Sequence, residues 1–92
     1  MNAKAKGSRN EYRTMRFLEK IGYSCTRAAA SLGVFDVIAI GEAGVRCIQV
    51  KSNRWPGSAE MEAITLFRVP TGVTREIWRW DDHARYPLVK TV

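Results

Sequence analysis

The sequence predicts a mixed α/β domain whose elements follow in the order α-β-β-β-α-β-β. Two observations support it: apolar residues recur at helical spacing over residues 8–21, and β-rich segments such as VFDVIAI, VRCIQVK and TREIWRW follow. A chain of 92 residues has room for one domain, residues 1–92. Its composition, 46% hydrophobic and 26% charged, is that of an ordinary globular protein.

The first helix is expected over residues 8–21, with Ser8 as its cap and Gly22 at its end. At about 100° per residue, its basic side chains form one stripe and its apolar side chains cover a broad opposite face. The stripe consists of Arg9, Arg13, Arg16 and Lys20, and the apolar face of Tyr12, Met15, Phe17, Leu18 and Ile21.

Glu11 falls near the middle of that apolar face, where a carboxylate is costly unless something uses it. Two interpretations are open. In a capping box, the Glu11 side chain folds back to the amide of Ser8. In the other interpretation, the carboxylate faces the sheet and serves a functional site, and the two roles alternate as substrate or metal binds.

The remaining elements are separated by glycine, proline and small residues. Gly41 and Gly44 bracket a short turn, so the second and third strands form a hairpin. In the second helix, Glu60 and Glu62 lie in the first turn, where the helix dipole favours acidic residues. The expected strands are residues 23–28, 34–40, 45–51, 74–80 and 86–92, and the second helix is residues 58–68.

The charge of the chain favours a polyanionic partner. Fifteen basic residues stand against nine acidic ones, a formal net charge of +6. Most of this excess lies before residue 28, where seven basic residues meet two acidic ones. A basic N-terminal third indicates binding to nucleic acid, although a basic surface that only keeps the protein soluble has the same composition.

Other classes of protein are excluded by simple patterns. No segment approaches the roughly 20 apolar residues of a membrane span, and the N-terminus lacks a secretory signal, so an intracellular, cytoplasmic protein is expected. Cys25 and Cys47 have no CxxC spacing and are expected to be free buried thiols. His83 has no Cys or His neighbours, so a zinc site is not expected. A small-molecule cofactor is not expected either.

The hairpin register brings three polar side chains together. If residues 41–44 form the turn, Ile40 pairs with Val45, and Asp36 lies opposite Gln49. Because side chains alternate along a strand, Lys51 shares their face. The two strands are otherwise apolar on both faces and are therefore expected to be central and covered. The residues that point the other way are Val37, Ala39, Ile48 and Val50.

This polar group suits a hard metal ion. Asp36 offers a charged oxygen, Gln49 a neutral one, and the backbone carbonyl of Val50 a third, a donor set typical of Mg²⁺ or Mn²⁺. Lys51 is then placed to orient the attacking water and to offset charge on a phosphate. The alternative is a structural Asp36–Lys51 ion pair with Gln49 as a hydrogen-bonding neighbour.

The segment KGSRNEYRTMRFLEKIGYSCTRAAASLGVFDVIAIGEAGVRCIQVKS, residues 6–52, resembles the archaeal-type Holliday junction resolvases of the PD-(D/E)XK nuclease superfamily. The resemblance implies a restriction-endonuclease-like mixed sheet flanked by helices, in a single nuclease domain. It also implies Mg²⁺- or Mn²⁺-dependent hydrolysis of phosphodiesters at four-way junctions in double-stranded DNA. Such enzymes act as homodimers, because two strands are cut symmetrically.

The resemblance implies a role for each residue of this chain that matches a motif position of the family. Glu11 matches the helical acid, Asp36 the metal-binding aspartate and Lys51 the catalytic lysine. Arg27 and Ser31 match the arginine and serine of the loop. Gln49 departs from the pattern, since most resolvases have glutamate there. A neutral oxygen binds Mg²⁺ more weakly than a carboxylate, so Glu11 gains importance as a second charged ligand. The implied catalytic set is Glu11, Ser31, Asp36, Gln49 and Lys51.

Basic residues near the start of the first helix and beside the strands are expected to contact DNA phosphates. The helical stripe serves either as part of this surface or only as a solvated face. The candidates are Lys4, Lys6, Arg9, Arg13, Arg27 and Arg54. Aromatic residues offer material for a dimer interface, although the last two share one side of a strand and equally suit the core. They are Trp55, Phe67, Trp78 and Trp80.

Three alternatives to a junction-resolving enzyme stay open. The first is a restriction- or repair-type nuclease that acts on other DNA structures. The second is a non-catalytic module that binds branched DNA, which the neutral Gln49 would permit. The third is a basic RNA-binding protein, which explains the charge but leaves the convergence of Asp36, Gln49 and Lys51 unexplained.

Overall fold

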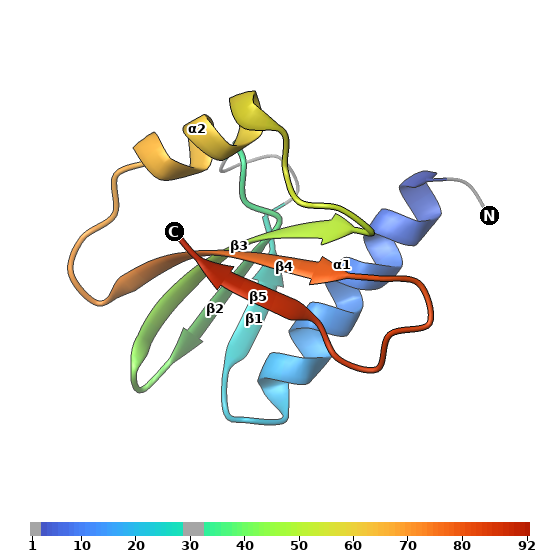
Figure 1. The fold of residues 1–92 in the computed structure, drawn as a ribbon. Coiled ribbons are helices and arrows are strands. Elements are labelled where there is room, and N and C mark those ends of the chain that lie inside the picture. The colour runs from blue at the N-terminus through green and yellow to red at the C-terminus, as the bar shows by residue number, and fades with distance from the viewer. Residues whose placement is uncertain (1–2, 29–32) are drawn as a thin grey trace.

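The computed structural model describes residues 3–28 and 33–92, and its elements follow the predicted order (Figure 1). One sheet holds the strands in the order β1-β2-β3-β4-β5. Neighbouring strands are antiparallel except β3 and β4, which are parallel and are joined through α2. The elements are α1 (Ala3–Glu19), β1 (Ser24–Arg27), β2 (Val37–Gly41), β3 (Gly44–Ser52), α2 (Ser58–Leu66), β4 (Val73–Trp80) and β5 (Leu88–Thr91).

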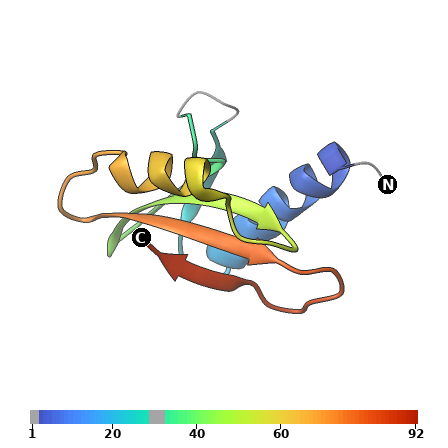
Figure 2. The same cartoon turned by 45° about the horizontal axis from the view of Figure 1, so that its top comes forward.

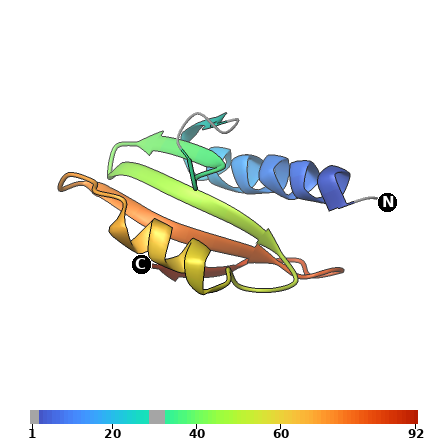
Figure 3. The ribbon, with the colours of Figure 1, turned by 90° about the horizontal axis from the view of Figure 1, so that it is seen from above.

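The two helices cover opposite faces of the sheet, as the tilted view and the view from above show (Figures 2 and 3). Each face has its own apolar cluster, so the central strands are buried on both sides, as predicted. The cluster under α1 contains Leu18, Val37, Ala39, Ile48, Trp78 and Trp80. The cluster under α2 contains Phe35, Cys47, Ile64 and Ile77.

The predicted hairpin register is confirmed. Ile40 pairs with Val45, and Val37 pairs with Ile48. Gly44, at the turn, has a φ of 135° and packs closely against the backbone of Gly72, so that any side chain there would overlap the Gly72 carbonyl oxygen. That same oxygen accepts a hydrogen bond from the Val45 amide at 2.9 Å, which fixes where β4 begins beside β3.

The first helix differs from the prediction at both ends and on its buried face. It begins at Ala3 rather than at residue 8, so Ser8 lies inside the helix and does not cap it. Tyr12 and Ile21, expected on the apolar face, are 45% and 60% exposed. Asn10 and Thr14 are buried in their place.

Hydrogen bonds explain this rotation of the buried face. The Asn10 side chain donates to Ser52 Oγ on β3 at 2.7 Å. The Thr14 hydroxyl donates to the Asn10 carbonyl and accepts from Trp80 Nε1, each at 2.8 Å. Polar side chains that find partners in this way are stable inside, and a pattern of apolar residues alone does not reveal them.

The other corrections are smaller. Residues 34–36 precede the second strand instead of belonging to it, and α2 ends at Leu66 rather than at residue 68. Trp78 and Trp80 are buried in the core under α1, which removes them from any interface. Cys25 and Cys47 are free, as predicted, and burial raises the pKa of both thiols. Among the described helices, none has the length and apolar character to cross a membrane.

Candidate active site

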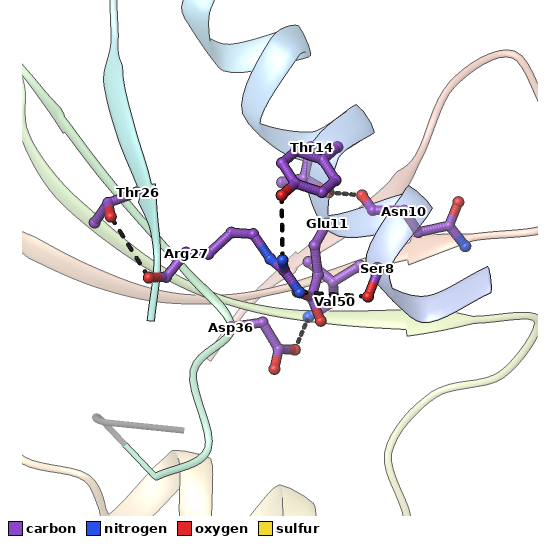
Figure 4. A network of polar contacts seen from close by, with 9 residues as sticks. Ser8, Asn10, Glu11, Thr14, Thr26, Arg27, Asp36 and Val50 are labelled. Atoms are coloured by element: carbon purple, nitrogen blue, oxygen red, sulfur yellow. Dashed lines mark hydrogen bonds and ion pairs between the residues drawn. The ribbon is translucent and has the colours of Figure 1, made fainter. Parts of the chain in front are cut away.

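Antiparallel and parallel pairing together bring the predicted site residues to one end of the sheet. This site end is where β1, β3 and β4 finish and where β2 begins. Asp36 directly precedes β2, while Gln49 and Lys51 lie near the end of β3. The N-terminal half of α1 passes the same end, as Figure 4 shows for Glu11 beside Arg27 and Asp36.

Backbone contacts on both sides hold Asp36 in place. Its amide donates to the Ile48 carbonyl, and its own carbonyl accepts from the Ala28 amide, both at 2.8 Å. Its side-chain Oδ2 accepts a hydrogen bond from the Val50 amide at 2.9 Å (Figure 4). Asp36 is therefore tied to β3 through both its backbone and its side chain, just before the regular strand pairing begins.

The charge on Asp36 is poorly compensated. Burial raises the pKa of this carboxyl group, and the Val50 hydrogen bond offsets only part of the effect. The nearby carboxylates of Glu11 and Glu60 raise the pKa further, whereas Lys51 lowers it, and the net shift is upward. A partly buried carboxylate with a raised pKa in a cluster of other charged groups is a frequent property of functional sites.

Gln49 and Lys51 share the face of β3 that α2 covers, as the register predicted. Gln49 is only 7% exposed, and its Nε2 donates to Glu60 Oε2 at 3.2 Å. Its Oε1 is buried without a hydrogen-bond partner among the described residues. The Lys51 ammonium lies 3.2 and 3.4 Å from the two Glu60 oxygens. The predicted alternative, an Asp36–Lys51 ion pair, is therefore replaced by a Glu60–Lys51 pair.

Glu60 is the site residue that sequence reasoning missed. Its place in the first turn of α2 was explained by the helix dipole alone. The signal that points to the site is its position shortly after the break at residues 55–57, which returns the chain to the face of β3. Which side of α2 meets that face depends on packing and cannot be read from so short a helix.

Glu11 pairs with Arg27, which excludes the predicted capping box. Arg27 Nε and Nη2 lie 2.9 and 2.8 Å from Glu11 Oε1. The same guanidinium donates to Ser8 Oγ at 3.4 Å (Figure 4). It also donates to the Tyr12 hydroxyl at 3.3 Å and lies over the Tyr12 ring. The helical acid and the loop arginine, expected to act separately, are therefore partners in this structure.

The donor atoms fit a divalent cation only as a mixed set. Within residues 3–28 and 33–92, no three His, Cys, Asp or Glu side chains are close enough to hold a metal by themselves. Asp36 and the unpartnered amide oxygen of Gln49 nevertheless supply the hard oxygens that Mg²⁺ or Mn²⁺ prefers. The role of the Val50 carbonyl stays a prediction, since the contact seen is from its amide to Asp36.

The remaining predicted site residues lie in varied settings. Ser31 lies outside the described residues. Lys6 forms an ion pair with Asp82 at 3.0 Å. Arg13 stacks on Trp80, with its guanidinium carbon 4.1 Å from the ring centroid. For DNA contact, these positions stay predictions, as do Lys4 on α1 and the solvent-exposed Arg9 and Arg54.

Comparison with solved structures identifies the fold. The chain is similar to the Holliday junction resolvase of Archaeoglobus fulgidus, an archaeal hyperthermophile, with a TM-score of 0.71. The two chains are 21% identical, and the match covers 94% of this chain and 70% of that one. Neither a protein-family model nor a curated protein sequence matches this chain. The predicted restriction-endonuclease-like mixed sheet, flanked by helices, is therefore confirmed.

Proposed function

We propose that this chain is a metal-dependent endonuclease that hydrolyses phosphodiesters in branched double-stranded DNA, with four-way junctions as its substrate. The observation that carries this proposal is the buried Oε1 of Gln49, which has no partner among the described residues and whose side chain shares one face of the hairpin with Asp36 and Lys51. These groups lie at one end of a sheet whose fold is also that of an archaeal Holliday junction resolvase. A protein that only packed there would have little reason to bury this oxygen without a partner among the described residues.

The side chains divide the chemistry among them. Asp36 and the Gln49 amide oxygen would hold the cation, which when bound polarises a phosphate and makes water more acidic. The Val50 amide fixes the Asp36 carboxylate against the hairpin, so that this ligand is oriented before any cation arrives. The Lys51 ammonium, once released from Glu60, stabilises the negative charge that develops on the phosphate oxygens.

Glu11 and Arg27 border the site on the side where α1 lies. As a pair, they present the Arg27 guanidinium at the site end, held from several directions by Glu11, Tyr12 and Ser8. A guanidinium placed in this way suits a DNA phosphate near the cleavage point. Direct binding of a cation by Glu11 would first require this ion pair to open.

Further cationic groups extend from the site end toward DNA. Arg9 and Arg54 are exposed on α1 and just after β3. Near Arg54, the Trp55 ring is flanked by the Arg79 guanidinium at 5.5 Å and by the Lys90 ammonium at 5.2 Å. We expect contacts with phosphates at these positions, which convey the shape of a branched duplex rather than its sequence.

A homodimer fits this substrate, because a two-fold assembly presents two sites to two strands. Trp78 and Trp80 are in the core, so the interface must use other apolar residues. The edge strand β5 and the end of α2 carry exposed apolar side chains that offer such a surface. They are Leu66, Phe67, Tyr86, Leu88 and Val89.

The test is cleavage of an end-labelled four-way junction with Mg²⁺ and with EDTA, against a linear duplex of the same sequence. We expect cutting of the junction only, and only with Mg²⁺. Equal cutting of the duplex would instead support a restriction- or repair-type nuclease. Tight junction binding without cutting at any Mg²⁺ or Mn²⁺ concentration would support the non-catalytic module. Preference for duplex RNA in a competition assay would support the RNA-binding alternative.

A further inference from the structure

We infer that Glu60, on α2, supplies to the divalent cation the carboxylate that Gln49 lacks. This inference rests on the proposed metal-dependent function and adds a residue to it. Glu60, Gln49 and Asp36 would then form the ligand set, with two charged oxygens and one neutral oxygen. Lys51 would be held by Glu60 without the cation and released when the cation binds.

The contacts between α2 and β3 support this assignment. Glu60 Oε2 accepts from Gln49 Nε2, and both Glu60 oxygens contact the Lys51 ammonium, so the carboxylate lies against both polar residues of β3. The amide of Gln49 thus has its nitrogen on Glu60 and its oxygen buried without a partner among the described residues. An amide held by its nitrogen in this way has its oxygen available to a cation.

The charges around the proposed cation site also favour Glu60 as a ligand. Mg²⁺ and Mn²⁺ sites in proteins are built on carboxylate oxygens, and Asp36 alone gives the site one negative charge. Glu11 is neutralised by the two-atom contact with Arg27. Glu60 is bound by Lys51, a single flexible ammonium group, and its own side chain is 47% exposed. Of the two neighbouring carboxylates, Glu60 is therefore the easier one to release.

The Lys51 ammonium already shows that the Glu60 carboxylate can bind a cation at this place. It lies within 3.4 Å of both oxygens, in the manner of a cation bound to a carboxylate. Replacement of this ammonium by a divalent ion would leave Lys51 free on the same face of β3. The side chain that stabilises charge on a phosphate would then become available only when the metal is bound.

The experiment measures Mn²⁺ binding by calorimetry, without DNA, for the parent protein, Glu60→Gln and Glu62→Gln. Glu62 is a matched control, since it is an exposed glutamate on the same helix. We expect Glu60→Gln to weaken Mn²⁺ binding by at least the roughly 10–100-fold that loss of an outer-shell partner costs. Glu62→Gln should bind Mn²⁺ as the parent does. Thermal melting in EDTA confirms that each variant is folded.

A double variant makes the test specific. If Glu60 provides the charge that Gln49 lacks, Gln49→Glu in the Glu60→Gln background should restore Mn²⁺ affinity to within a few-fold of the parent. Unchanged affinity in Glu60→Gln would overturn the inference and leave the proposed function standing. If the parent binds no Mn²⁺ and Mn²⁺ shifts the melting temperature of neither the parent nor Asp36→Asn relative to EDTA, the metal-dependent function fails as well.

Discussion

Two carboxylates of this domain, Glu76 buried on β4 and Asp36 half-buried just before β2, lie in contrasting settings. Glu76, toward the end where β3 and β4 begin, is 3% exposed and receives two hydrogen bonds from Arg46, at 2.7 and 2.8 Å. Thr74 and the Trp78 indole also donate to it. Burial alone would raise the pKa of Glu76, but these hydrogen bonds outweigh burial and lower that pKa from its ordinary value of 4.5.

Asp36, at the site end, has much less support. Among the described residues, its carboxylate has one hydrogen-bond donor, the Val50 amide. Its pKa is raised from an ordinary value of 3.8, chiefly by burial, with Glu11 and Glu60 adding to the rise. The comparison teaches that the fold can fully satisfy a buried carboxylate, and that it does so for Glu76. At Asp36 the missing positive charge is what a divalent cation would supply.

The largest difference between the two ends should appear in catalysis. Asp36→Asn keeps the shape of the side chain and removes the negative charge of the proposed cation ligand. We expect junction cleavage to fall by about 10³-fold or more, roughly 4 kcal/mol in the barrier, while junction binding changes only a few-fold. Glu76→Gln is the control, and per folded molecule it should keep its activity. Mg²⁺-dependent cutting by Asp36→Asn at near the parent rate would remove Asp36 from the proposed site.

The next largest difference should appear in stability. Arg46→Ala leaves Glu76 buried without its cation, which should lower the free energy of unfolding by about 3–5 kcal/mol. Lys51→Ala breaks a more exposed pair at the site end and should cost about 1 kcal/mol or less. Urea denaturation of both variants in EDTA measures the two values. Similar losses would mean that the two ends contribute alike to folding.

The two carboxylates should also give opposite pH dependences. Because the pKa of Glu76 is lowered on folding, its contribution is present above 4.5 and is lost as the pH falls through the native pKa. Because the pKa of Asp36 is raised, its contribution is present below 3.8 and is lost as the pH rises through the native pKa.

These signs lead to a simple comparison of variants in EDTA. From acid to neutral pH, the parent should gain stability relative to Glu76→Gln and lose stability relative to Asp36→Asn. The check is to measure the free energy of unfolding of the parent and of both variants at several pH values from about 3 to 7. Profiles that stay parallel for the parent and either variant would show that the corresponding carboxylate keeps its ordinary pKa.

The smallest effect concerns DNA binding. Arg9 lies on the half of α1 that passes the site end, whereas Lys20 follows the last turn of α1 at the other end. If Arg9 contacts a phosphate, Arg9→Ala should reduce the slope of log K against log[salt] by about 0.9, with Lys20→Ala unchanged. If a junction-binding titration gives both variants the same slope of log K against log[salt], the DNA does not contact Arg9.

Much of the site could be predicted because strand pairing is regular. Once residues 41–44 were identified as the turn, the register placed Asp36 opposite Gln49 and put Lys51 on the same face, and that register is confirmed. Strands that are apolar on both sides also predict that both faces of the sheet are covered by other elements. These inferences depend only on local periodicity, which the sequence displays directly.

What could not be predicted depends on contacts between distant segments. The buried positions of Asn10 and Thr14 depend on Ser52 and Trp80, which lie far away in the sequence. The position of Glu60 at Gln49 likewise depends on how α2 packs across β3. Hydrogen bonds of this kind carry no periodic signal. The apolar pattern therefore places Met15, Phe17 and Leu18 correctly on the inner face, but it wrongly adds Tyr12 and Ile21 and leaves out the buried polar residues.

The decisive measurement compares the free energies of unfolding of the parent and Asp36→Asn. Both are measured by urea denaturation at neutral pH, first in EDTA and then in excess Mn²⁺. In EDTA, Asp36→Asn should be the more stable protein, because it lacks a partly buried and poorly compensated charge. In Mn²⁺, the order should reverse, since a cation present at 100 times its Kd adds about 2.7 kcal/mol to the protein that binds it. An equal response of both proteins to Mn²⁺ would contradict a cation site at Asp36.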